Sequence, residues 1–219
     1  MAVRVKIEGI TSVADARAAI RYGADAVGLV FARSPRQVDI KKARRIVASL
    51  GPFVQSVGLF VDASIDQIIT TGNAVGFDML QLHGKETPSW INRYLDAPFI
   101  KAFRPRDARF TAQLQRFAAA LDRRHQWRAV LLDAYHPKLA GGTGKTLPWE
   151  WIARARSNGK LKGLPALVLA GGLNPDNVAQ AVRIAQPVAV DVASGVESSP
   201  GKKDYDKLRD FIAAAKAAT

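Results

Sequence analysis

The chain has 219 residues, 48% hydrophobic and 23% charged, and this ordinary composition argues against a disordered, collagen-like or coiled-coil protein. The absence of cysteine excludes disulfides, thiolate metal sites and a thiol nucleophile. No apolar run approaches the roughly 20 residues of a membrane span, and the N-terminal residues lack a signal-peptide pattern, so we expect a cytoplasmic protein without a membrane partner.

The charge is strongly basic, since 32 Lys and Arg face 19 Asp and Glu, giving a formal net charge of +13. A basic balance attracts polyanions and phosphorylated small molecules alike. Part of the excess lies between residues 93 and 128, where a solvated helix face and its flanking loops account for it. No nucleic-acid-binding signature accompanies the charge, so we expect no nucleic-acid partner.

Short β-branched or apolar runs alternate with amphipathic stretches along the chain. The runs predict strands at Val3–Ile7, Ala26–Phe31, Gln55–Val61, Asp78–Leu82, Phe99–Phe103, Ala129–Asp133, Ala166–Leu169 and Val188–Val192. The stretches predict helices at Ser12–Tyr22, Ile40–Leu50, Ser64–Asn73, Pro88–Leu95, Phe110–Leu121, Pro148–Arg156, Pro175–Ile184 and Tyr205–Ala218. Thr11 or Ser12 can cap the first helix, and prolines stand near the starts of later ones.

This alternation predicts the fold. Eight strand–helix units in 219 residues, about 27 residues each, fit a closed parallel barrel, and an open doubly wound sheet is the main alternative. The alternation continues to the last helix, and no linker or shift in composition marks a second domain. We therefore predict an α/β protein, a (β/α)8 TIM barrel that forms a single domain over residues 1–219.

Two loops after the predicted seventh and eighth strands carry glycines suited to binding phosphate. One contains Gly171 and Gly172, and the other contains Ser194 and Gly195. Glycine lets backbone amides approach an anion closely, and these two loops of a barrel lie side by side at the catalytic rim. Either pair alone could serve turn geometry, but their joint position predicts a phosphate site formed by all four residues.

A third glycine-rich loop, Gly141–Lys145, follows the predicted sixth strand. The sequence Gly144-Lys145-Thr146 resembles the end of a Walker A loop, but Leu139 stands where the first glycine should be, so a nucleotide P-loop is rejected. We predict instead a rim loop that closes over the substrate, with Gly142 among the substrate-binding residues.

Two carboxyl groups are predicted at strand ends on different sides of the barrel mouth. Lys6 and Glu8 share the charged face of the first strand, which points into a barrel, and Asp133 ends the sixth strand. A carboxylate and a carboxylic acid placed there could transfer protons at two positions of a sugar. Glu8 could also form a structural ion pair with Lys6, which is compatible with an ionised base, and Asp133 could instead cap the following turn.

Three further polar residues are candidates for substrate binding. Arg36, in the loop after the second strand, could clamp a substrate carboxylate or remain a solvated loop charge. His83 ends the fourth strand and could be functional or simply a hydrogen-bonded structural residue. Asp191 could touch the ligand or orient its own loop. No carboxylate–histidine cluster has metal-ligand spacing, so no metal is implied.

A set of short motifs runs along the chain in a characteristic order. They are VKI-x-GIT at Val5–Thr11, GAD at Gly23–Asp25, GLVF at Gly28–Phe31, SPR at Ser34–Arg36, VGLFV at Val57–Val61, QLHG at Gln81–Gly84, LLDA at Leu131–Ala134, GGTGK at Gly141–Lys145, LAGGL at Leu169–Leu173, DVASGVE at Asp191–Glu197 and PGKKD at Pro200–Asp204. Each motif is weak alone, but their joint order and spacing are specific. The chain resembles the phosphoribosylanthranilate isomerases of tryptophan biosynthesis, essentially end to end.

The resemblance implies a (β/α)8 barrel that performs an Amadori rearrangement without a cofactor. N-(5-phosphoribosyl)anthranilate would open its ribose ring and become 1-(2-carboxyphenylamino)-1-deoxyribulose 5-phosphate. The resemblance implies Asp133 as the general acid that protonates the furanose ring oxygen, and Arg36 facing the anthranilate carboxylate. It implies the two glycine loops as the phosphate site. Barrels of this kind occur as monomers and dimers, so a monomer or homodimer is expected.

One position departs from the family pattern. The family reads K-I-C-G-I-T, with the cysteine as general base, and Glu8 stands at that position here. Glu8 could be a functional replacement, a lesion or a sign of altered substrate preference. A carboxylate is ionised at pH 7, but it is a weaker base than a thiolate and its side chain is longer. The leading hypothesis is an isomerase with Glu8 as base. The alternatives are a barrel that binds the phosphosugar without efficient turnover and, from charge alone, a nucleic-acid-binding protein.

Overall fold

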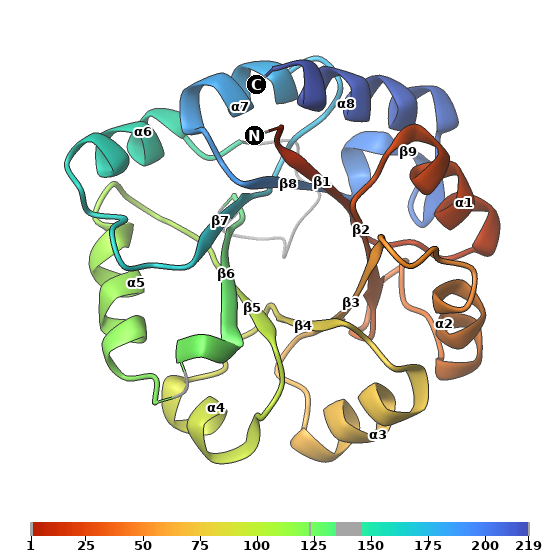
Figure 1. Ribbon diagram of the computed structural model, residues 1–219, viewed down its shortest axis with the longest axis horizontal. Coiled ribbons are helices and arrows are strands. Elements are labelled where there is room, and N and C mark those ends of the chain that lie inside the picture. Colours follow the sequence, from red (N-terminus) through yellow and green to blue (C-terminus); the bar gives the residue numbers. More distant parts are fainter. Residues whose placement is uncertain (1, 123, 135–145, 219) are drawn as a thin grey trace.

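Eight parallel strands close into a barrel within residues 2–122, 124–134 and 146–218, which the computed structural model describes (Figure 1). The strands are β1 (Arg4–Ile7), β2 (Ala26–Val30), β3 (Gln55–Phe60), β4 (Met79–Leu82), β5 (Phe99–Phe103), β6 (Trp127–Leu132), β7 (Ala166–Leu169) and β8 (Ala189–Val192). The barrel closes where Lys6 of β1 pairs in register with Asp191 of β8. This closure confirms the predicted TIM barrel and rejects the open sheet.

The helices that follow the strands surround the barrel (Figure 1). They are α1 (Val13–Tyr22), α2 (Ile40–Val47), α3 (Ile65–Val75), α4 (Pro88–Tyr94), α5 (Phe110–Ala119), α6 (Trp149–Ser157), α7 (Val178–Ala185) and α8 (Tyr205–Ala217). Ser12 caps α1 by accepting a hydrogen bond from the Asp15 amide, as one of the two predicted caps. Gly23 ends the same helix in the left-handed conformation that glycine adopts without strain.

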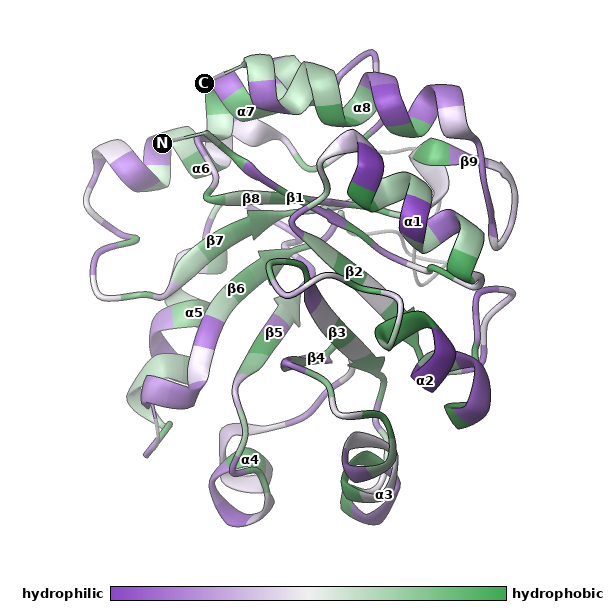
Figure 2. Cartoon of the chain, turned by 45° about the vertical axis from the view of Figure 1, so that its right-hand side comes forward, coloured by the Kyte–Doolittle hydropathy of each residue, from purple (hydrophilic) through white to green (hydrophobic). Residues whose placement is uncertain are grey.

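Two hydrophobic cores hold these layers together. The larger one lies between strands and helices, and a smaller one inside the barrel is built from Val57, Ile100, Ala102, Ala129, Leu131, Val168 and Ala170. Figure 2 shows β6 and β7 as hydrophobic ribbons, whereas the helices outside carry both hydrophilic and hydrophobic positions. The inner apolar side chains come mainly from β3 and β5 to β7, which leaves the interior beside β1, β4 and β8 to polar residues.

The loop after β8 differs most from the sequence prediction, because it contains elements that were not expected. A 3-10 turn, η2 (Ser194–Val196), leads into a small antiparallel hairpin of β9 (Glu197–Ser199) and β10 (Lys202–Lys203). These strands are too short for an alternation pattern to reveal them. Helix α7 also begins later than predicted, because Asn174 and Asn177 form a turn that follows the glycine loop and precedes the helix.

Lys203 anchors this hairpin to the barrel. Its side chain is completely buried, and its Nζ donates hydrogen bonds to the Glu8 carbonyl at 2.7 Å and the Ala193 carbonyl at 3.1 Å. Nζ also forms an ion pair with Glu197 at 3.1 Å. Burial lowers the pKa of Lys203, and the Glu197 carboxylate opposes that effect. One buried cation therefore ties the hairpin to the ends of β1 and β8.

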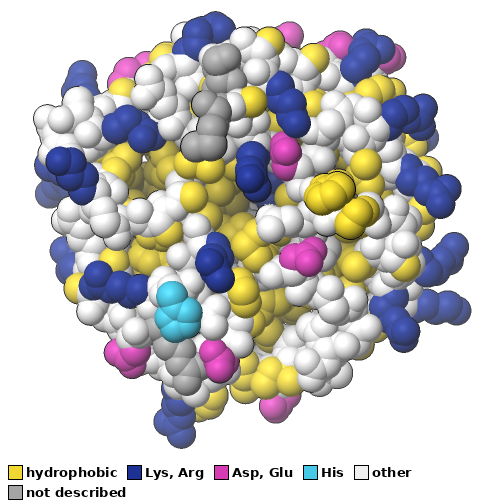
Figure 3. All heavy atoms as spheres, viewed as in Figure 1, with side chains coloured by type: hydrophobic (Ala, Val, Ile, Leu, Met, Phe, Trp, Pro, Cys, Tyr) yellow, Lys and Arg dark blue, Asp and Glu magenta, His cyan; other side chains and the backbone are white. Residues whose placement is uncertain are grey.

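The surface charge is spread rather than gathered. On the face seen in Figure 3, Lys and Arg side chains lie both around the outer edge and near the centre, with Asp and Glu side chains among them. Among the described residues, none of the helices is both long and apolar enough to cross a lipid bilayer.

We expect Lys203→Met to destabilise the protein by about 3 kcal/mol, because it removes one partner of a buried ion pair and leaves carbonyl acceptors unsatisfied. Lys202→Met is the matched control: the neighbouring side chain is exposed, so its loss should change the free energy of unfolding by less than about 0.5 kcal/mol. Urea unfolding of both variants measures the difference. Equal effects would show that the buried ammonium does not anchor the hairpin.

Candidate active site

A cavity of about 980 Å³ opens where the carboxyl ends of the barrel strands meet. Its lining includes the sequence-predicted residues Glu8, Arg36, His83, Asp133, Gly171, Gly172, Asp191, Ser194 and Gly195. The predicted substrate-binding Gly142 lies outside the described residues. The barrel thus brings together side chains from segments that are far apart in the sequence, and it does so at the end where catalytic residues of this fold are found.

Glu8 lies just beyond β1, buried at 7% exposure, with its carboxylate held from three directions. Its Oε2 accepts hydrogen bonds from Lys6 Nζ at 2.5 Å and Gln81 Nε2 at 3.2 Å, and its Oε1 accepts one from the Gly9 amide at 3.1 Å. Gly28 on β2 leaves the room that this carboxylate fills, because a Cβ at that position would lie 2.1 Å from Glu8 Oε1. The longer side chain therefore fits.

Lys6 is a buried cation shared by two carboxyl groups, Glu8 and Asp191. Its Nζ lies 3.0 Å from Asp191 Oδ1, on the opposite side from Glu8. Burial alone would lower the pKa of Lys6, but the two carboxylates outweigh it and raise that pKa. Burial raises the pKa of Asp191 to about 6 despite the opposing attraction of Lys6. The predicted Lys6–Glu8 ion pair is present, and Asp191 completes it while lining the cavity.

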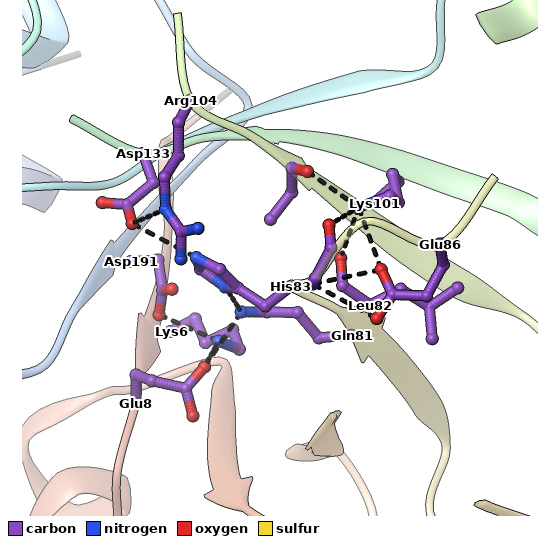
Figure 4. A network of polar contacts seen from close by, with 12 residues as sticks. Lys6, Glu8, Gln81, Leu82, His83, Glu86, Lys101, Arg104, Asp133 and Asp191 are labelled. Carbon is purple, nitrogen blue, oxygen red and sulfur yellow. Dashed lines mark hydrogen bonds and ion pairs between the residues drawn. The ribbon is translucent and has the colours of Figure 1, made fainter. Parts of the chain in front are cut away.

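Asp133 lies across the cavity from Glu8, between His83 and Arg104 (Figure 4). Its Oδ2 is 3.2 Å from His83 Nε2 and 3.5 Å from Arg104 Nε. Burial would raise the pKa of Asp133, but the His83 hydrogen bond and the Arg104 charge outweigh it and hold the pKa below its usual range. The carboxyl group is therefore ionised at neutral pH. The turn that Asp133 could cap lies outside the described residues.

Gln81 connects Glu8 to His83, and through His83 to Asp133. Its amide nitrogen lies 3.2 Å from Glu8 Oε2 and 3.0 Å from His83 Nδ1, so one hydrogen-bonded chain connects Asp133 to Glu8 and onward to Lys6 (Figure 4). His83 is thus a hydrogen-bonded residue that also faces the cavity, and the two alternatives considered for it are compatible.

Arg36 is neither solvated nor free. Its Nε and Nη2 donate to the two carboxylate oxygens of Glu197 at 2.8 and 2.7 Å, and its side chain is 19% exposed. Glu197 is in turn bound by Lys203 of the same hairpin. Burial would raise the pKa of Glu197, but Arg36 and Lys203 outweigh it and lower that pKa. The hairpin therefore fixes where the Arg36 guanidinium lies at the cavity wall.

The two glycine loops pack against each other and line the cavity after β7 and β8. Gly171 and Gly172 have φ values of +83° and +68°, which side chains of L-residues rarely adopt. A Cβ on Gly195 would lie 1.9 Å from the Leu173 carbonyl oxygen, so only glycine permits this approach of backbone to backbone. Three glycines without side chains therefore line the cavity here, which leaves main chain accessible for the predicted phosphate site.

A family model described as N-(5'phosphoribosyl)anthranilate (PRA) isomerase matches residues 5–214. The N-(5'-phosphoribosyl)anthranilate isomerase of Geobacter sp. (strain M21) is 47% identical over 214 residues, which are 97% of this chain and 98% of the relative. The isomerase of Acidithiobacillus ferrooxidans is 48% identical over 212 residues, 96% of each chain. This chain belongs to the phosphoribosylanthranilate isomerase family.

Solved structures of phosphoribosylanthranilate isomerases share the fold closely. The crystal structure of the Thermotoga maritima enzyme has a TM-score of 0.86 at 39% identity, covering 98% of this chain and 99% of that chain. A second structure is of an isomerase in complex with reduced 1-(o-carboxyphenylamino)-1-deoxyribulose 5-phosphate. It has a TM-score of 0.82 at 36% identity and also covers 98% of this chain and 99% of that chain. The barrel described here is therefore the fold of this isomerase family.

The sequence prediction missed three residues of the polar network at this cavity: Gln81, Arg104 and Glu197. Gln81 shares an inner strand face with His83, and Arg104 follows Ala102 in the same alternation along β5, so the period of two could have pointed to both. No local pattern marks Glu197, because its role depends on a hairpin that brings it to Arg36.

We expect Gly195→Ala to weaken the binding of inorganic phosphate at least about tenfold, because a backbone carbonyl occupies the place of the new methyl group and the two loops must separate. Gly51→Ala is the control, since no atom lies within 4 Å of a Cβ there. Calorimetric titration with phosphate measures the affinity, and circular dichroism verifies the fold. Unchanged phosphate affinity in folded Gly195→Ala would contradict the prediction that the two glycine loops bind phosphate.

Proposed function

We propose that this chain isomerises N-(5'-phosphoribosyl)anthranilate to 1-(2-carboxyphenylamino)-1-deoxyribulose 5-phosphate by an Amadori rearrangement. The observation that carries the proposal is the pair of buried carboxyl groups, Glu8 and Asp133, which face one cavity in a barrel of this isomerase family. Substrate and product are isomers, so a proton donor and a proton acceptor are the groups that the reaction requires.

The ends of the cavity suit the two anionic ends of the substrate. Backbone amides of the two glycine loops would bind the phosphate, and Arg36 would face the anthranilate carboxylate. Glu197 takes the Nε hydrogen and one Nη2 hydrogen of Arg36, so the hydrogens of Nη1 and the second hydrogen of Nη2 are left to meet that carboxylate. Binding at both ends would hold the sugar between Glu8 and Asp133 and thereby reduce the entropic cost of the reaction.

Asp133 would act first, as the general acid. Its proton passes to the furanose ring oxygen, the bond between that oxygen and C1 breaks, and the anthranilate nitrogen forms a C1=N bond. Its lowered pKa leaves Asp133 ionised at neutral pH, so it must take up a proton as the substrate binds. Arg104, whose side chain is 31% exposed, can turn towards the anionic substrate and release Asp133, while exclusion of water favours the neutral acid.

Glu8 would then act as the general base in place of the family's cysteine. It removes the proton from C2, the electron pair forms a C1=C2 bond, and the iminium nitrogen becomes neutral. Tautomerisation of the resulting enolamine, in which C2 becomes a ketone and C1 gains a proton, completes the product. Gly28 provides the space that the longer side chain needs, which favours Glu8 as a working replacement over a lesion.

A binding protein with little turnover is the second candidate, and one specific observation favours it. The Glu8 carboxylate already accepts hydrogen bonds from Lys6, Gln81 and Gly9. A proton arriving from the substrate must therefore reach a lone pair that these three donors leave open. The two candidates share the ligand and differ in rate.

Turnover of freshly prepared substrate, followed by loss of its fluorescence, decides between the candidates. We expect Glu8→Gln to lower kcat by at least about 10²-fold with little change in KM, because it removes the base and preserves the shape. Glu8→Cys should retain turnover, because a thiolate is the stronger base. Full activity of Glu8→Gln would exclude Glu8 as the base. No turnover in the native chain, with tight binding of a product analogue, would select the binding protein.

We expect a product analogue to bind at pH 7 with net uptake of protons, because Asp133 is ionised in the empty site and neutral in the complex. Calorimetry in buffers of different ionisation enthalpy measures the number of protons taken up on binding. Asp133→Asn should lower this number by about one. The phosphate group titrates equally in both proteins, so the difference isolates Asp133. Equal uptake in the two proteins would show that Asp133 does not carry the proton.

A further inference from the structure

Gln81 occupies the centre of the polar network, and the proposed reaction assigns it no step. Its side chain is fully buried on the inner face of β4, and it lies between Glu8 and His83 (Figure 4). Its Nε2 is within hydrogen-bonding distance of both, at 3.2 Å from Glu8 Oε2 and 3.0 Å from His83 Nδ1. Its Oε1 is buried and has no hydrogen-bond partner.

The Glu8 carboxylate determines which way this amide faces. An ionised carboxylate only accepts hydrogen bonds, so the NH2 group and not the oxygen of Gln81 must face Glu8. The reverse orientation would bring Gln81 Oε1 against a carboxylate oxygen. The unpartnered Oε1 is the consequence of this choice, because both hydrogens of the amide are used and the oxygen is turned away from every donor.

The amide in turn determines which nitrogen of His83 carries the proton. The second N–H of Gln81 points at His83 Nδ1, which must therefore accept. The ring proton then lies on Nε2, where it is donated to Asp133 at 3.2 Å. The ionised Asp133 carboxylate can also only accept, so it requires the same tautomer from the other side of the ring. The amide orientation set by Glu8 and the hydrogen bond that Asp133 receives are thus mutually consistent.

We infer that Gln81 is a positioning residue that aims the Glu8 carboxylate and fixes His83 as the tautomer that donates to Asp133. The His83 tautomer can be measured in the protein without substrate and does not depend on the proposed reaction. The effect on rate rests on the proposed function, in which Glu8 and Asp133 transfer the protons.

Nitrogen-15 NMR of the imidazoles tests the tautomer without turnover. The chain has three histidines, and His83→Gln identifies the resonances of interest. At neutral pH, His83 of the native protein should show an unprotonated Nδ1 and a protonated Nε2. Gln81→Glu should protonate Nδ1, because a carboxylate can only accept there, and Gln113→Met, at an exposed position of α5, should change nothing. A His83 pattern that is the same in native protein and Gln81→Glu, or protonated at Nδ1 in the native protein, would overturn the inference.

Kinetics test the positioning of Glu8. We expect Gln81→Met, which preserves length and removes both donors, to lower kcat by about 10–100-fold with KM changed less than about threefold. In a Glu8→Cys background the same substitution should cost less than about threefold, because the carboxylate that Gln81 aims is gone. Equal losses in both backgrounds, with both proteins folded, would show that Gln81 acts as packing. An inactive native chain would refute the proposed function and leave the NMR result to decide this inference.

Discussion

The site depends on one buried cation, Lys6, held between two carboxyl groups inside the barrel. Charges in a protein interior are tolerated only when they are paired and hydrogen-bonded, and Lys6 satisfies this condition with Glu8 on one side and Asp191 on the other. The pair Lys6–Asp191 also spans the seam where β1 meets β8, so the contact that completes the barrel and the contact that holds Glu8 belong to the same ammonium group.

The proposed acid and the proposed base are connected to each other by hydrogen bonds. Asp133 and Glu8 lie at opposite walls, yet His83 and Gln81 join them through consecutive hydrogen bonds. The carboxylates of Glu8 and Asp133 can only accept, so the two ends of the chain together fix the direction of each hydrogen bond between them. A change of charge at one end therefore alters the hydrogen bond at the other, which is how a site with two proton-transfer groups can keep them in complementary states.

A separate buried network supports the cavity wall from outside. Lys203, Glu197 and Arg36 form a chain of alternating charges that connects the hairpin after β8 to the loop after β2. The glycine loop with Ser194 and Gly195 leads directly into this hairpin. The same hairpin therefore holds both the proposed phosphate loop and the guanidinium that is proposed to face a carboxylate. Their separation is thereby set by buried ion pairs rather than by flexible loops.

The sequence by itself determined the order of strands and helices, the barrel and the position of the two glycine loops, because period, glycine position and chain order are local properties. It also placed Glu8 and Asp133 at strand ends, since side-chain alternation along a strand follows from backbone geometry. Only the tertiary structure decided which groups these residues meet. The Gln81 bridge, the Arg104 contact and the Glu197 clamp join segments distant in the chain, and hydrogen-bond direction and burial arise only once the barrel has closed.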